Sequence, residues 1–116
     1  MDFKFINTEY IETVSGGDTE VVKELVGIFR DQAVEFTAEM RSLLASKDYF
    51  NLGLLAHKAK SSVAIVGMAD LASLLKTFEL EAKAGSNPEN YKSYISRFES
   101  DTKGAVRELE SYVAGI

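Results

Sequence analysis

One long stretch of the chain repeats apolar residues at intervals of three and four, and this periodicity restricts the fold more than any other feature. The repeated positions are Val22, Leu25, Phe29, Ala33, Phe36, Met40 and Leu43. An α-helix has about 3.6 residues per turn, so this spacing gathers the side chains on one face. The pattern predicts a long amphipathic helix that ends near Ser46.

Glycines and capping residues divide the rest of the chain into further helices. The predicted helices are, in order, Asn7–Ser15, Asp18 or Thr19 to about Ser46, Asp48 to about Val66, about Asp70 to Gly85, and a last helix from Asn87. Asn87-Pro88-Glu89 is typical of a helix start, with Asn87 as the cap and Pro88 at the first helical position. Gly67 is predicted to make a tight reversal between the third and fourth helices.

Each of the later helices also carries one apolar face. The residues expected to be buried are Leu52, Leu55, Ala56, Ala59, Val63 and Val66, then Leu71, Leu75, Phe78 and Ala82, then Tyr91, Ile95, Phe98, Thr102, Ala105, Leu109 and Tyr112. Four long helices with one apolar face each and short connections predict an all-α fold: an antiparallel up-down four-helix bundle with a short extra N-terminal helix. We expect a single domain over residues 1–116.

Composition excludes several classes of function. The chain has no cysteine, which removes disulfides, thiolate metal sites and cysteine nucleophiles. Its N-terminus lacks the pattern of a signal peptide, and no apolar run approaches the ~20 residues that span a bilayer. We therefore expect a cytoplasmic protein without a membrane partner. The net charge of −5 argues against nucleic acid as a partner.

The only histidine, His57, is predicted to point away from the core, about 150° from the middle of its helix's apolar face. Its neighbours on the helix surface are Gly53, Lys60, Ser61 and Ala64. Three of them are small, so the backbone of another protein can approach the ring.

The segment around this histidine is basic in an otherwise acidic chain. No Asp or Glu occurs from Tyr49 through Ala69, whereas Lys58 and Lys60 both do. Two interpretations remain open: chance in a mostly buried helix, or a site that receives negative charge. Two interpretations are also open for Leu54 and Ile65: they are isolated apolar residues on the surface, or they form the rim of a docking patch.

The turn at Gly67 predicts which residues of the next helix lie opposite the histidine. In an antiparallel hairpin, His57 is level with about Thr77, which places Lys76 and Glu79 closest to it. A carboxylate at Glu79 would fix the imidazole tautomer and leave the other nitrogen as nucleophile. The alternative is a common surface ion pair between Glu79 and either Lys76 or Lys83 of its own helix.

Most chemistries of a lone histidine are excluded by what the chain lacks. Ser61 lies one turn from His57, but N–H groups inside a helix are already bonded, so no oxyanion hole is available for hydrolysis. One histidine without a carboxylate cluster is a poor metal site, and no glycine-rich phosphate loop occurs. A phosphoryl group carried on an exposed imidazole beside lysines remains.

The run His57-Lys58-Ala59-Lys60-Ser61-Ser62, with Gly67 ten positions after the histidine, resembles the histidine-containing phosphotransfer (HPt) domains of two-component phosphorelays. Their pattern is H-x-(apolar)-K-G-S-(S/A)-x-x-x-G, and Ser61 here replaces the usual glycine. The resemblance implies that His57 accepts phosphate, that Lys60 steadies the phosphoryl oxygens, and that Ser62 and Gly67 are the family's serine and glycine. Glu79 matches a carboxylate that contacts the ring in the chemotaxis-kinase member.

The resemblance also implies the partners. The chain is expected to accept phosphate from an aspartyl-phosphate receiver domain of a response regulator or hybrid histidine kinase, and to pass it to another receiver, rather than act as an enzyme. The residues expected to touch a receiver are Gly53, Leu54, Lys58, Ser61, Ala64, Ile65 and Lys76. We expect a monomer with no cofactor of its own, and Mg²⁺ in the receiver; the Met1 start favours a domain that works alone. The alternative is a helical adaptor that binds receivers without carrying phosphate.

Overall fold

The computed structural model describes residues 3–116; Met1 and Asp2, where the expected domain begins, lie outside the described residues. The regular elements of the described part are α1 (Thr8–Ser15), α2 (Thr19–Ala45), α3 (Tyr49–Ile65), α4 (Ala69–Ala84), the short 3₁₀ turn η1 (Pro88–Asn90) and α5 (Tyr91–Ala114). The predicted all-α fold, a short helix followed by four long ones, is confirmed. Within residues 3–116, no helix is both long and apolar enough to cross a membrane.

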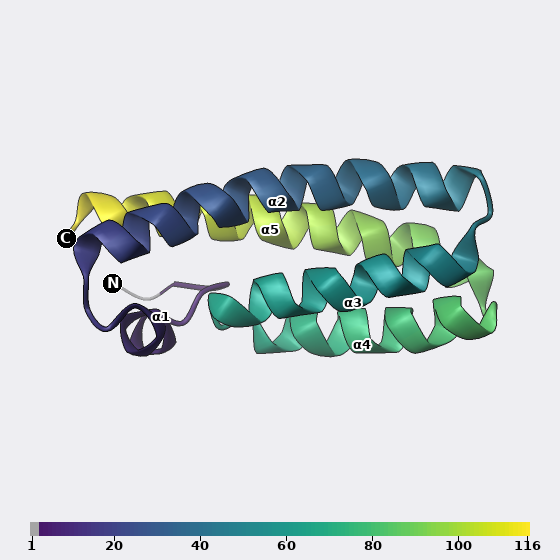
Figure 1. Ribbon diagram of the computed structural model, residues 1–116, viewed down its shortest axis with the longest axis horizontal. Helices are drawn as coiled ribbons and strands as arrows, with labels where there is room; N and C mark the ends of the chain where they lie inside the picture. The colour runs from purple at the N-terminus through teal and green to yellow at the C-terminus, as the bar shows by residue number, and fades with distance from the viewer. Residues whose placement is uncertain (1–2) are drawn as a thin grey trace.

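The four long helices form an elongated antiparallel bundle of 43 × 20 × 20 Å (Figure 1). Helices α2 and α5 lie side by side, as do α3 and α4, and contacts of α2 with α3 and of α4 with α5 join the two pairs. The most extensive interface is between α3 and α4. Successive helices are therefore neighbours, as expected for short connections.

The two pairs of helices differ in length, and the N-terminal segment fills the difference. Helices α2 and α5 have 27 and 24 residues, whereas α3 and α4 have 17 and 16. Figure 1 shows α1 and the segment before it at the end of the bundle that α3 and α4 do not reach. The Glu108 carboxylate on α5 accepts hydrogen bonds from the backbone N–H groups of Lys4, Phe5 and Ile6 at 2.8–3.2 Å.

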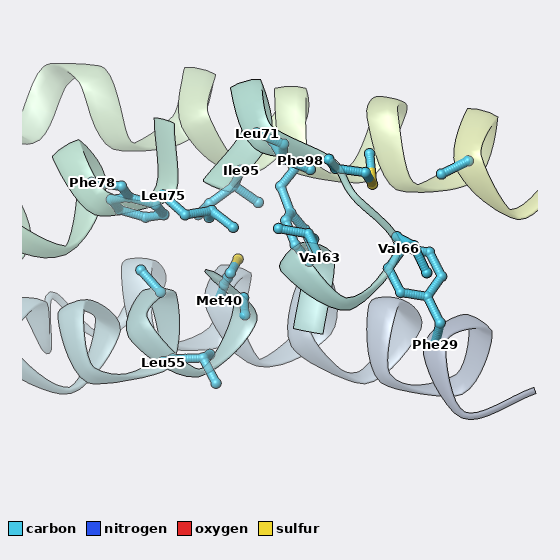
Figure 2. Packing of buried hydrophobic residues seen from close by; sticks show 14 of the residues in the cluster. Phe29, Met40, Leu55, Val63, Val66, Leu71, Leu75, Phe78, Ile95 and Phe98 are labelled. Atoms are coloured by element: carbon cyan, nitrogen blue, oxygen red, sulfur yellow. The ribbon is translucent and has the colours of Figure 1, made fainter. Parts of the chain in front are cut away.

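The core runs along the bundle axis and contains the apolar faces predicted for α3 and α4. Figure 2 shows part of it, with Met40 of α2, Val63 of α3, Phe78 of α4 and Phe98 of α5 in one cluster. Fully burying a side chain of this size contributes about 1.5–3 kcal/mol, so the face that each helix buries fixes its rotation. Tyr112, predicted as buried, is half-buried at the end of α5.

Capping side chains set most of the helix starts, and one prediction about them is wrong. Asn7, Asp18 and Asp48 accept hydrogen bonds from N–H groups in the first turns of α1, α2 and α3. Asn87 does not cap α5: its backbone is left-handed (φ 53°) and its side-chain amide donates to Oε2 of Glu81 at 3.0 Å. A capping residue has extended backbone, so from this left-handed position the chain first makes the 3₁₀ turn, and α5 begins after it.

Candidate functional site

The site is built on the outer face of α3. Asp48 caps this helix, and the burial of its apolar stripe against the bundle fixes its rotation. His57 lies on the opposite side of the helix from that stripe, and 54% of its side chain is exposed. An imidazole in this position is accessible to another macromolecule while its helix remains anchored in the core.

One edge of the His57 ring is held by a buried carboxylate of α4. The distance from Nδ1 of His57 to Oε1 of Glu79 is 3.0 Å, and the Glu79 side chain is only 5% exposed. The second carboxylate oxygen, Oε2, accepts a hydrogen bond from Nζ of Lys83 at 2.7 Å. Of the two alternatives posed by the sequence, a ring contact or an ion pair within α4, the structure contains both.

These contacts determine the charge of Glu79. The hydrogen bond from Lys83 has the largest effect, and with the contact to His57 it outweighs burial and lowers the pKa of Glu79 from 4.5 to about 2. Glu79 is therefore ionised near neutral pH and can only accept hydrogen bonds. For the His57 contact to be a hydrogen bond, the proton must sit on Nδ1, so the neutral ring has its lone pair on Nε2.

Gly53, expected on a surface facing a partner, is buried, and this corrects the prediction. A Cβ atom built here would lie 3.0 Å from the backbone O of Glu79 and 3.0 Å from the backbone N of Lys83. Gly53 sits one turn before His57 on α3. Its missing side chain thus lets α4 approach closely at the turn that holds the ring contact.

The exposed side of the site carries cations without partners. Lys58 and Lys76 are exposed and Lys60 is half-buried. Within the described part of the chain, none of these three ammonium groups makes a hydrogen bond or an ion pair. They are therefore available to an anionic ligand, whereas the charge of Lys83 is engaged by Glu79.

Apolar side chains flank His57 along the same face of α3. Leu54 and Ile65 are 39% and 40% exposed, so both are accessible and the short helix α1 covers neither of them. Phe50, which the sequence analysis did not single out, is 58% exposed one turn before Leu54. Ser61 and Ala64 are exposed too and complete the stripe. We call these five residues (Phe50, Leu54, Ser61, Ala64 and Ile65) the α3 face.

Ser62 and Gly67, the two remaining residues of the histidine motif, contact other segments of the chain. Oγ of Ser62 donates to Oε1 of Gln32 on α2 at 2.8 Å, which ties α3 to α2 one turn after His57. Gly67 has φ +79°, and a Cβ atom there would lie 2.5 Å from Cβ of Asn7. Backbone conformation and the close N-terminal segment therefore both require glycine at this turn.

Sequence reasoning missed two residues of the site, Gln32 and Phe50. Phe50 has a signal in the sequence, since it lies four residues from Leu54 and hence on the same helix face. Gln32 has none, because only the packing of α2 against α3 places it beside Ser62.

Among protein-family models, that of the Hpt domain matches residues 24–111. Comparisons with curated proteins and with solved structures give no match. The matched range begins inside α2, ends inside α5, and includes both helices that build the site.

Proposed function

Since this chain belongs to the Hpt family of histidine phosphotransfer domains, we propose that it carries a phosphoryl group on His57 from one receiver domain to another. Domains of this family act as phosphotransfer intermediates in phosphorelays and interact with receiver domains. The observation that carries the assignment to His57 is its geometry. The ring is exposed, and its Nδ1 is engaged by an ionised Glu79, which leaves Nε2 free to react.

The transfer step requires no proton movement at the reacting nitrogen. The lone pair of Nε2 attacks the phosphorus of an aspartyl phosphate on the donor receiver, the bond from phosphorus to the aspartate oxygen breaks, and the aspartate leaves as a carboxylate. The phosphorylated ring keeps its proton on Nδ1 and becomes cationic, and Glu79 is placed to stabilise that charge. Attack by a second aspartate on the phosphorus reverses these steps.

Lys60 is the residue we assign to the phosphoryl oxygens. It follows His57 by three positions on α3, so both side chains leave the same side of the helix. Its ammonium group has no partner among the described residues, so binding a phosphoryl group breaks no existing ion pair. Its role in the transition state is charge stabilisation.

The receiver is proposed to dock on the α3 face, with Lys58 and Lys76 at its edge. The exposed apolar residues on both sides of His57, Leu54 and Ile65, support this location. The free lysines favour the acidic pocket of a receiver by charge complementarity. Among residues 3–116, no group of three or more His, Cys, Asp or Glu side chains is arranged to hold a metal. The proposal assigns Mg²⁺ to the receiver.

The test is phosphoryl transfer from a panel of labelled receiver domains to the wild-type chain and to His57→Gln. The wild type should acquire an acid-labile label from at least one receiver. His57→Gln should acquire none, and its helical circular dichroism should be unchanged because the ring lies outside the core. Label on His57→Gln would refute the assignment. A receiver that binds the wild type without transferring its phosphate would instead favour the adaptor function.

A further inference from the structure

The Glu79 carboxylate is positioned by a second residue, Lys83, that lies one turn further along α4. Lys83 and Glu79 are four residues apart on the same helix, and Nζ lies 2.7 Å from Oε2. The contact of Oε1 with the His57 ring is 3.0 Å. Because the two oxygens of a carboxylate are rigidly linked, a bond that fixes Oε2 also fixes the direction in which Oε1 points.

The stem of Lys83 is itself held in place by the close packing of α3 on α4. A Cβ atom at Gly53 would lie 2.8 Å from Cγ of Lys83. The stem therefore occupies the space that a side chain on α3 would take. The contact aligns Lys83, Glu79 and His57 across the interface between the two helices.

Lys60 and Lys83 are the two lysines assigned to the site, and they differ in whether their ammonium group is already bonded. Lys60 has no bonded partner among the described residues, whereas Lys83 is bound to Glu79 and is 34% exposed. A bare carboxylate under the ring would repel an approaching phosphoryl group. The charge of Lys83 compensates that of Glu79, so the free lysines at the surface dominate the field that the phosphoryl group meets.

We propose that Lys83 is a positioning residue for phosphotransfer, which holds Glu79 so that the His57 proton stays on Nδ1 and Nε2 remains the nucleophile. This inference rests on the proposed function of His57. It differs from a purely structural ion pair in one respect. A structural pair changes the stability of α4, whereas a positioning residue also changes which ring nitrogen of the folded protein carries the proton.

The experiment compares ring tautomers in the folded, unphosphorylated chain by ¹⁵N NMR of His57. In the neutral ring, the two tautomers are distinguished by their nitrogen shifts. The wild type should be mainly the Nδ1–H form. Lys83→Met should shift the population towards Nε2–H, because Glu79 loses the bond that orients it.

The same variants are then assayed for phosphoryl acceptance from a receiver. Lys83→Met should accept phosphate roughly three- to tenfold more slowly than the wild type, the scale expected when a group orienting a reactive imidazole is lost. Lys83→Arg keeps the charge and should restore both the tautomer and most of the rate. Lys92→Met removes an exposed lysine of α5, outside the site, and should change neither.

An unchanged tautomer population in folded Lys83→Met would overturn the inference, as would failure of Lys83→Arg to restore it. If the Met variant loses its helical circular dichroism, Lys83→Gln, which keeps an N–H donor and most of the stem, takes its place with the same expected direction. The tautomer measurement needs no phosphate. A wild type that is Nδ1–H but accepts no phosphate would therefore contradict the proposed function and leave the positioning of the ring intact.

Discussion

The two sides of the His57 ring are built differently. The inner side consists of Gly53, Glu79 and Lys83, where the carboxylate is buried and both of its oxygens are bonded. The outer side carries lysines that have no partner among residues 3–116, and the partly exposed apolar residues of the α3 face. In the proposed function, the inner side decides which nitrogen reacts, and the outer side decides what can reach it. Substitutions on the inner side should thus alter the free protein, and those on the outer side only its encounter with a partner.

The largest effects are expected on the inner side of the ring, and one of them should come from filling the space at Gly53. Gly53→Ala brings Cβ to 3.0 Å from backbone atoms of α4, which cannot move independently. We expect a loss of about 1–2 kcal/mol in the free energy of unfolding after the gain in helix propensity is subtracted. Urea denaturation measures it.

Gly27 in α2 supplies a matched control for that substitution. A Cβ atom at Gly27 would meet nothing within 4 Å, so Gly27→Ala should stabilise the protein by about 0.5–1 kcal/mol through helix propensity alone. Equal effects of the two substitutions would mean that the α3–α4 contact at Gly53 is looser than described.

An effect of similar size, also on the inner side, is expected for Glu79→Gln. The variant loses two charge-assisted hydrogen bonds, to His57 and Lys83, and should be less stable by about 2 kcal/mol near neutral pH. Because folding lowers the pKa of Glu79 from 4.5 to about 2, its stabilisation is fully present above pH 4.5 and is lost as the pH falls towards 2.

Acid titration therefore separates this effect from simple packing. The stability difference between the wild type and Glu79→Gln should shrink steadily from pH 5 to pH 2, as measured by urea denaturation at each pH. A difference that stays constant over this range would show that the carboxylate charge is not what stabilises the contact.

A smaller effect is expected on the outer side, from Lys60→Ala. The variant lacks the cation that we assign to the phosphoryl oxygens, so transfer should be slower or the lifetime of phosphohistidine shorter, roughly tenfold. The free energy of unfolding should change by no more than about 0.5 kcal/mol. Lys92→Ala, on the helix diagonally opposite α3, serves as the control in the same transfer assay. Transfer and lifetime equal to those of the control would remove Lys60 from the site.

The smallest effect should come from the apolar part of the α3 face. Leu54→Ser should weaken receiver binding about threefold, since Leu54 is already partly buried in the free protein and has limited further area to lose. Val34→Ser, an exposed position on α2, should leave binding unchanged. Titration of the receiver against each variant gives the comparison, and equal affinities for both would place the docking surface elsewhere.

Regular elements were predictable because local patterns specify them. The apolar periodicity of α2, the buried faces of α3 and α4, and the caps Asn7, Asp18 and Asp48 all agree with the structure. The start of α5 was not predictable, because Asn87 has the right residue type for a cap but takes a left-handed backbone and donates its amide to Glu81. The residue types of a helix start do not reveal this backbone conformation.

The residues of the site also fall into those that local patterns predict and those that only the packing of the helices explains. Helical geometry alone placed His57 on the outer face and Glu79 on the facing helix. The separation and rotation of α3 against α4 decided the rest. They determine that Gly53 faces α4 and that Glu79 is buried, where Lys83 bonds it.

By itself, then, the order of residues determined the helices, the side of each helix that enters the core, and the presence of one exposed imidazole among lysines. These depend on periodicity and charge along a single helix. Only the tertiary structure decided that Glu79 is buried against the ring and that it engages Nδ1 of His57. This contact depends on a distance of 3.0 Å between atoms of two helices, and such a distance arises from how closely the helices pack.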